Sequence, residues 1–250
     1  ASVRKDVGVQ VPPRPQLMLV RFSFIVQQLT ELRRSQNLLW NLTLRELRSK
    51  YRRSFLGWAW SMLNPLSNMV IYWFVFGVVF GATAPTGNPS GIQVYALYLL
   101  SGILPWGFFA LVTNLGLGSL LGNSGLVKKV YFAWETLVFA QVIFSFVQFC
   151  IEMTLLCVAL LIVGSPIAPW IPVAFVLMLL LAVYAAGFAL ALSTLAVYFR
   201  DLRYLWTIII QVMFFATPII YTPDKIAGKV PPILEFILHW NPMAVFILSF

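Results

Sequence analysis

Residues 40–80 decide the fold, and they read WNLTLRELRSKYRRSFLGWAWSMLNPLSNMVIYWFVFGVVF. The first part has the spacing of a helix with an apolar face beside a cationic face. The apolar face consists of Trp40, Leu44, Leu47 and Tyr51, and the adjacent face consists of Asn41, Arg45, Arg48 and Arg52. Such a helix is expected to lie in a membrane surface, with its charges among anionic headgroups. Residues 56–80 follow without a charge, and at about 1.5 Å per residue they can cross about 30 Å of hydrocarbon.

The basic part of this stretch, residues 37–55, has three interpretations. It can be a solvated helix beside the membrane that only fixes the orientation of the first span. It can also be a surface that handles an anionic, lipid-linked substrate. The third interpretation is a docking surface for a cytosolic partner.

The composition excludes a soluble protein. The 250 residues are 60% hydrophobic and 10% charged, whereas soluble domains carry roughly 25% charged residues. The long apolar runs are continuous, which favours an all-α, polytopic membrane protein. The net charge of +9 could suggest a nucleic-acid partner, but the basic residues lie in loops and flanks, as the positive-inside rule predicts. We therefore expect a membrane protein that binds no nucleic acid.

The apolar runs predict five full membrane spans, at about 56–80, 93–117, 136–163, 173–198 and 204–221. Before them come a cytoplasmic arm at 1–36 and the interface helix at 37–55, so that residues 56–250 form the membrane domain. The tail holds two apolar pieces that each begin at a proline and are too short to span. One interpretation is a pair of short re-entrant helices at about 231–250 on the outer face. The alternative is a sixth span that begins near Asn241 and continues beyond Phe250.

The distribution of basic residues predicts the orientation. With the N-terminus in the cytoplasm, every Lys and Arg except Lys225 and Lys229 lies on the cytoplasmic side. The reverse orientation would reverse that bias, so we expect a cytoplasmic N-terminus.

Polar residues inside the spans predict a shared interior lining. In the third span, one helical face carries Gln141, Ser145, Gln148 and Glu152. The first span carries a similar stripe with Asn64, Asn68 and Tyr72, and the fifth span contributes Gln211. A carboxylate in hydrocarbon costs several kcal/mol, so Glu152 should face the bundle interior or a wet cavity. The alternative is that the stripes only form hydrogen bonds between helices.

The sequence offers little for chemistry at a bound metal or nucleotide. Cys150 and Cys157 lie about 10 Å apart along one helix, too far for a mutual disulfide, and are expected to be core residues. One His and no Cys/His cluster predict no metal site. The phosphate-binding pattern G-x-x-x-x-G-K-[ST] is absent, so we expect no ATP binding by that route. The acids are too few and too scattered for a carboxylate-based active site. We therefore expect no catalytic residue, no enzyme activity and no cofactor in this chain.

Several segments together resemble a known family. The first-span pattern comprises Tyr51, Arg52, Ser54, Leu56, Gly57, Trp60, Leu63 and Pro65. The other segments are SGLVKKVYF (124–132), after which Ala133 stands where a Pro is usual, YFRDL (198–202), TPIIY (217–221) and NPM (241–243). As a set they resemble the permease subunits of ABC transporters that export polysaccharides. This is the O-antigen and teichoic-acid export group, with the type-2 ABC exporter fold.

The resemblance implies a half-transporter in the bacterial inner membrane. Two copies would pair as a homodimer, and each would dock a separately encoded ATPase subunit that binds ATP and Mg²⁺. The cargo would be a polysaccharide joined by pyrophosphate to a polyprenyl lipid, of the O-antigen, teichoic-acid or cell-wall galactan type. It would move from the cytoplasmic to the outer face. The family normally has a sixth span, which we expect beyond residue 250.

For a transporter of this kind, we hypothesise roles for four groups of residues. The lipid pyrophosphate would be received by Arg45, Arg48, Tyr51, Arg52 and Arg53. The ATPase-coupling loop would consist of Ser124, Gly125, Leu126, Val127, Lys128, Lys129, Tyr131 and Phe132. The conduit would be lined by Asn64, Asn68, Tyr72, Gln141, Ser145, Gln148, Glu152 and Gln211. The outer gate would include Pro218, Tyr221, Asn241 and Pro242.

Two other functions stay open at this stage. An integral-membrane enzyme that acts on polyprenyl-phosphate sugars would share the basic interface helix, but it should also bring acids or His together on one face. The sequence shows no such convergence. A permease of the same fold for drugs or small lipids is the second alternative, because fold does not fix cargo.

Overall fold

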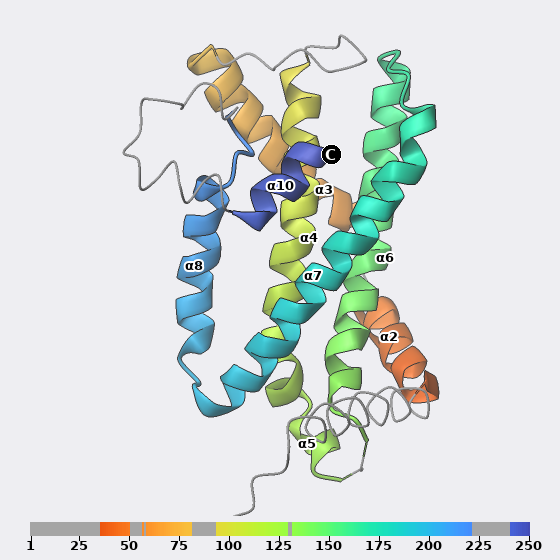
Figure 1. Cartoon of the computed structure of the whole chain (residues 1–250), viewed down its shortest axis with the longest axis vertical. Coiled ribbons are helices and arrows are strands. Elements are labelled where there is room, and N and C mark those ends of the chain that lie inside the picture. Colours follow the sequence, from red (N-terminus) through yellow and green to blue (C-terminus); the bar gives the residue numbers. More distant parts are fainter. Residues whose placement is uncertain (1–35, 51–56, 58, 82–93, 130–131, 222–240) are drawn as a thin grey trace, which may run out of the picture.

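The computed structural model describes residues 36–50, 57, 59–81, 94–129, 132–221 and 241–250. Within these ranges the chain forms helices joined by short turns, without a strand. The helices are α2 (Gln36–Lys50), α3 (Ala59–Tyr72), the π-helix η1 (Trp73–Val79), α4 (Tyr95–Gly122), α5 (Ser124–Val127), α6 (Glu135–Ile162), the 3₁₀-helix η2 (Ala168–Trp170), α7 (Ile171–Tyr198), α8 (Leu202–Ala216) and α10 (Pro242–Ser249). Figure 1 shows them as a bundle of long helices. The all-α prediction is confirmed for the described residues.

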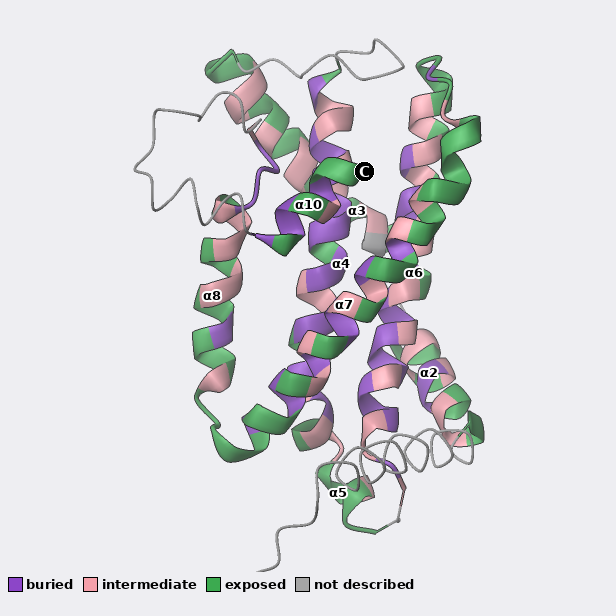
Figure 2. Ribbon diagram, in the orientation of Figure 1, coloured by how far each residue is buried: buried purple, intermediate pink, exposed green. Residues whose placement is uncertain are grey.

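α4 lies at the centre of this bundle, where it contacts α3, α6, α7, α8 and α10 (Figures 1 and 2). Its closest crossing is with α7, because a Cβ added to Gly116 would lie only 2.5 Å from the Ala189 Cβ. Ala185 and Ala189 of α7 are both fully buried there. Small residues at a crossing let two helix backbones approach closely, which is the usual way that membrane helices gain packing contacts.

Aromatic rings hold α4 between its two long neighbours. Phe108 stacks on Phe149 of α6, with ring centroids 4.7 Å apart. One residue further along α4, Phe109 stacks on Tyr184 of α7 at 5.7 Å. Both α4 rings are essentially inaccessible to solvent. Stacked pairs of this kind contribute about 0.5–1.5 kcal/mol beyond the burial of their area.

The two ends of the bundle hold different segments. α2, α5 and the turn between α7 and α8 lie at the lower end in Figure 1, and the turn between α6 and η2 lies at the upper end. α10 lies against α4 and α7, with Met243 and Ala244 buried. The basic segments that the sequence predicts to be cytoplasmic, α5 and the turn at Arg200, are therefore at the same end.

The boundaries differ from the prediction in three places. α4 continues to Gly122, beyond the predicted end at residue 117. α8 ends at Ala216 rather than 221, because Thr217 precedes a proline and adopts an extended conformation (φ −106°, ψ 135°). The predicted helix pair at 231–250 is described only as α10, since residues 231–240 lie outside the described residues.

The number of membrane spans stays a prediction. Four described helical segments are long and apolar enough to cross a membrane, namely Met62–Val79, Tyr95–Gly122, Glu135–Ile162 and Ala168–Tyr198. α8 is apolar but shorter, and its 15 residues extend over about 22 Å at 1.5 Å per residue. The predicted fifth span is thus a helix that falls short of about 30 Å of hydrocarbon by itself.

Candidate functional site

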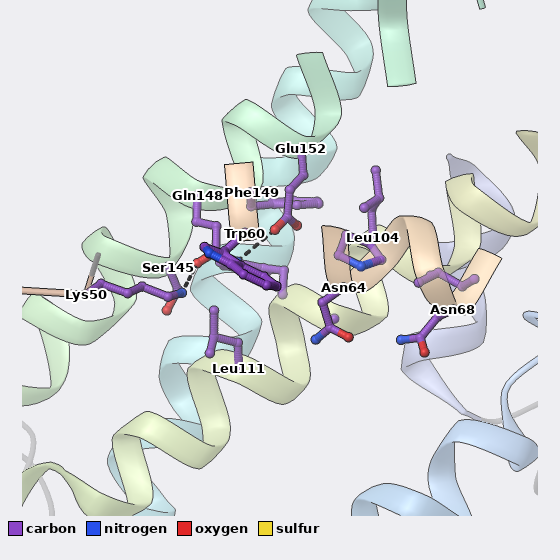
Figure 3. Close-up of a pocket in the computed structure, with 14 residues that line it drawn as sticks. Lys50, Trp60, Asn64, Asn68, Leu104, Leu111, Ser145, Gln148, Phe149 and Glu152 are labelled. Atoms are coloured by element: carbon purple, nitrogen blue, oxygen red, sulfur yellow. Dashed lines mark hydrogen bonds between the residues drawn. The ribbon is translucent and has the colours of Figure 1, made fainter. Parts of the chain in front are cut away.

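A cavity of about 270 Å³ with a mixed polar and apolar lining lies between α3, α4 and α6. Figure 3 shows side chains from these helices around it, with Lys50 of α2 entering from one side. Its polar lining consists of Lys50, Trp60, Asn64, Asn68, Ser145, Gln148 and Glu152. The cavity is the meeting point of the two polar stripes that the sequence places in the first and third spans.

The α6 wall of the cavity is a buried polar stripe. The relative exposure is 0% for Ser145, 9% for Gln148 and 6% for Glu152. The Gln148 side-chain amide donates a hydrogen bond to a Glu152 carboxylate oxygen, 2.7 Å away. The Ser145 hydroxyl has no hydrogen-bond partner among the described residues. A buried, unpaired hydroxyl costs free energy.

Lys50 reaches the same wall from the end of α2. Its ammonium donates to the Gln148 side-chain oxygen and lies 4.9 Å from the centroid of the Phe144 ring. Part of Lys50 stays exposed, yet desolvation lowers the pKa of its ammonium from the usual value, while the Glu152 carboxylate acts in the opposite direction. Gln148 is therefore held between a cation and an anion.

Lys50 was not among the predicted site residues, because it lies on neither of the two helical faces described for residues 40–52. A signal was nevertheless present. An acid buried in a span needs a cation or hydrogen-bond donors nearby, and Lys50 is the last residue of the interface helix. The missing information was that α2 runs beside α6.

The α3 wall carries an aromatic and two amides. Trp60, Asn64 and Asn68 follow one another at intervals of four residues and therefore share a face of the helix. Figure 3 shows all three at the cavity. Trp60 is 47% exposed, so its indole lies at the edge of the cavity and not in the core.

Five of the eight residues predicted to line a conduit thus meet at one cavity, namely Asn64, Asn68, Ser145, Gln148 and Glu152. The other three lie elsewhere. Tyr72 packs its ring 5.8 Å from that of Phe214, Gln141 is buried on α6 outside the cavity lining, and Gln211 is exposed on α8. α8 lies on the opposite side of α4 from α6 (Figure 1). Gln211 is therefore not part of this cavity, and its predicted place in a conduit stays a prediction.

The interface helix packs on α6 through a face that the sequence analysis missed. Leu42 joins Leu137 and Ala140 in a buried cluster, whereas Trp40, on the predicted apolar face, is 60% exposed. Lys50 contacts α6 about 20 Å from its start, at 1.5 Å per residue. α2 therefore runs along part of α6, and its expected place in the membrane surface stays a prediction.

The predicted coupling loop begins as the short helix α5. Its residues from Ser124 to Lys129 are exposed, apart from a half-buried Leu126. Next to it, the Arg45 guanidinium donates to the Asn123 side-chain oxygen at 3.2 Å and to the Glu46 carboxylate at 2.8 Å. This contact ties α2 to the start of α5.

Several predicted site residues cannot be placed with the others. Tyr51, Arg52, Arg53 and Tyr131 lie outside the described residues. Phe132 packs beside the Leu42 cluster, and Arg48 is exposed on α2. Arg45 and Arg48 are thus the described members of the predicted headgroup site.

Hydrogen bonds of the Asn241 side chain hold the predicted outer gate together. The Asn241 amide donates to the Thr217 hydroxyl at 2.9 Å, and its side-chain oxygen accepts from the Met243 backbone N–H at 3.0 Å. That second bond caps the N-terminus of α10. Pro218 is buried beside them, and Pro242 begins α10.

Two tyrosines of α4 form hydrogen bonds with the segment that follows α8. The Tyr95 hydroxyl donates to the Ile220 carbonyl at 2.8 Å. The Tyr98 hydroxyl donates to the Tyr221 carbonyl at 3.1 Å. Neither donor was among the predicted gate residues, since the sequence does not show which helix the segment after α8 packs against.

Comparison with known proteins places the chain among transporters. The family model described as ABC-2 type transporter matches residues 37–250. The chain is 30% identical over 209 residues to an O-antigen export system permease protein of Klebsiella pneumoniae, covering 83% of this chain and 76% of the relative. It is 28% identical over 230 residues to the corresponding protein of Myxococcus xanthus, covering 90% and 83%. A polysialic acid transport protein of Escherichia coli matches 34% of the chain and 31% of its own length at 29% identity.

Proposed function

Because the chain belongs to the ABC-2 type transporter family, we propose that it is the membrane subunit of an ABC transporter that exports a polysaccharide. The observation that carries this proposal is the match to O-antigen export permeases over most of both chains. It agrees with the resemblance of the first span, the coupling loop and the outer segments. The described helices support a multi-pass membrane protein. The bacterial inner membrane, with the N-terminus in the cytoplasm, is the location that the basic residues favour.

ATP hydrolysis by a separate ATPase subunit powers this transporter. α5 offers a place to dock it, because this short helix is exposed at the end of the bundle and is followed by Lys128 and Lys129. The sequence has no phosphate-binding loop of its own. ATP and Mg²⁺ accordingly bind to the partner, and two copies of the permease pair with two copies of the ATPase.

α2 connects the docking helix to the cavity. Arg45 bonds to Asn123 at the start of α5, and Lys50, at the end of the same helix, bonds to Gln148 in the cavity wall. A rigid-body shift of α5 would move α2, and α2 would move the cavity wall. Nucleotide-driven closure of the ATPase reaches the membrane helices by this route.

The cargo enters as a polysaccharide joined to a polyprenyl pyrophosphate. Arg45 and Arg48 are exposed on α2, and guanidinium groups are well suited to bind phosphate oxygens in pairs. Tyr51, Arg52 and Arg53 complete this headgroup site. The polar and aromatic faces of the membrane helices line the conduit for sugars, and the segment around Pro218, Tyr221 and Asn241 closes its outer end.

Depletion of the protein in cells tests the function. We expect the lipid-linked polysaccharide to accumulate on the cytoplasmic side while its synthesis continues, which a glycosidase that cannot cross the membrane would detect as protected glycan. Unchanged delivery of every surface polysaccharide after depletion would contradict the proposal.

Charge reversal at α5 tests the docking site. Lys128→Glu with Lys129→Glu should abolish co-purification of the ATPase subunit and export, whereas Lys128→Arg with Lys129→Arg keeps the charge and should preserve both. Normal ATPase binding by the Glu variant would remove α5 from the docking surface.

A further inference from the structure

We propose that the cavity between α3, α4 and α6 holds one uncharged sugar ring of the cargo and rejects acidic sugars. The inference rests on the proposed function and names the substrate class at one position within a single chain. It follows from three properties of the cavity. Its polar groups can form more hydrogen bonds than they already make, aromatic rings form part of its wall, and the one cation and one anion of its described lining balance each other.

The polar groups of the cavity match those of sugar hydroxyls. The carboxylate of Glu152 lies in the cavity wall. Glu152 accepts one bond from Gln148, while a carboxylate has about four acceptor positions. Asn64 adds an amide from the opposite wall. A ring that carries several hydroxyls can donate to the carboxylate and accept from the Asn64 amide.

The apolar part of the cavity fits the other face of such a ring. Trp60 presents its indole at the edge of the cavity, where it is 47% exposed, and Phe149 of α6 also contributes to the wall (Figure 3). Sugar rings have an apolar face that packs on a flat aromatic surface. The volume of about 270 Å³ is below the roughly 300–1,000 Å³ of pockets for drug-sized ligands, so the cavity suits one ring and not a longer piece of the chain.

The charges select against an acidic sugar. Lys50 and Glu152 are the charged residues of the described lining, and Gln148 bonds to both of them. The ammonium is therefore already engaged, and a second carboxylate in the cavity would lie close to Glu152. Like charges held close together in a partly buried site repel each other. An uncharged ring avoids this repulsion.

The wild-type protein provides the first test. The full chain, reconstituted in lipid nanodiscs without the ATPase, would be mixed with the methyl glycosides of glucose, galactose and mannose, and with the uronic acid of each. Saturation-transfer NMR reports which of them contact the protein. We expect transfer to at least one neutral glycoside and at least tenfold less to its uronic acid at neutral pH. No transfer to any neutral glycoside, or equal transfer to both members of every pair, would overturn the proposal.

Two variants locate the binding. Trp60→Ala should weaken neutral-sugar binding by about tenfold, while Trp73→Ala, which removes an exposed tryptophan on η1 outside the cavity, should leave it unchanged. Glu152→Gln keeps the size of the side chain and one acceptor oxygen but removes its charge, so it should bind the uronic acid at least as well as the neutral glycoside. A uronic acid still rejected by a folded Glu152→Gln protein would contradict the charge argument.

The site and the transport function can fail separately. Export in cells that is normal in wild type and in Trp60→Ala, combined with no glycoside binding to wild type, overturns the site and leaves the function intact. Glycoside binding that depends on Trp60, in a protein whose depletion leaves all surface polysaccharides unchanged, supports the site and overturns the export function.

Discussion

α4 and the α3–η1 segment are both apolar helical segments of spanning length, but they are buried to very different extents. In α4, 61% of an 18-residue stretch is buried inside the chain, whereas no residue from Met62 to Val79 is. α4 uses its apolar surface to hold α6 and α7 together (Figure 2). α3–η1 packs only Met69, Tyr72, Phe76 and a few neighbours against the core, and it leaves most of its apolar surface for lipid or for another chain. α4 is therefore the scaffold of the bundle, and α3–η1 forms part of its surface. Substitutions should lower stability strongly in α4 and weakly in α3–η1.

The largest effect is expected at the crossing of α4 and α7. Gly116→Leu should prevent these helices from meeting, since even a Cβ at this position would lie 2.5 Å from the Ala189 Cβ. Overpacking usually costs about 1–3 kcal/mol, and more where backbones must separate. Fluorescence-detected size-exclusion chromatography of a tagged protein should show loss of the folded peak.

Gly187→Leu is the matched control for this variant. Gly187 lies in α7, and a Cβ added there meets no atom within 4 Å. This substitution should leave the folded peak intact. If both variants kept or both lost the folded peak, α4 and α7 would not pack as closely at Gly116 as described.

An intermediate effect on stability is expected where α4 contacts the segment that follows α8, residues 217–221. Tyr95→Phe removes the hydroxyl that donates to the Ile220 carbonyl, which should cost about 1–3 kcal/mol because a buried acceptor loses its partner. Thermal unfolding should then occur at least about 2–4 °C lower. Tyr204→Phe, at a position 75% exposed on α8, should leave the midpoint unchanged. A shift of similar size in both variants would contradict a specific tie between α4 and Ile220.

The smallest effect on stability is expected in η1. Phe74 is 56% exposed, so Phe74→Ala should change the free energy of unfolding by no more than about 0.5 kcal/mol. If the exposed face of α3–η1 meets a second copy, as the proposed homodimer suggests, the same variant should lower the paired fraction measured by chemical cross-linking. Strong destabilisation of the single chain would place α3–η1 in the core and remove the contrast with α4.

The sequence predicted the helices better than it predicted their neighbours. Continuous apolar runs were sufficient to find α4, α6 and α7, because length and hydropathy decide which segments can cross a membrane. The spacing of Ser145, Gln148 and Glu152 placed them on one face, and the structure brings that face to Asn64 and Asn68. Local periodicity carries this information for any helix.

Contacts between helices were not predictable in this way. Lys50 reaches Gln148 because α2 runs along α6, and no pattern within 37–55 indicates that direction. α8 lies across α4 from α6, so Gln211 is not part of the cavity. The end of α8 was missed by five positions because the apolar run continues through Ile219 and Ile220, whereas Pro218 favours an extended conformation at Thr217.

Reconstituted transport tests the central claim most directly, namely that the chain is a passage for polysaccharide powered by a separate ATPase. Vesicles would contain the chain, its partner ATPase or both, together with a polyprenyl-pyrophosphate-linked polysaccharide, and a glycosidase would report the glycan that reaches the far side. We predict ATP-dependent appearance of the glycan only when both subunits are present, and no ATP hydrolysis by the chain alone. Transfer that proceeds without the ATPase, or ATP hydrolysis by the purified chain alone, would contradict the account.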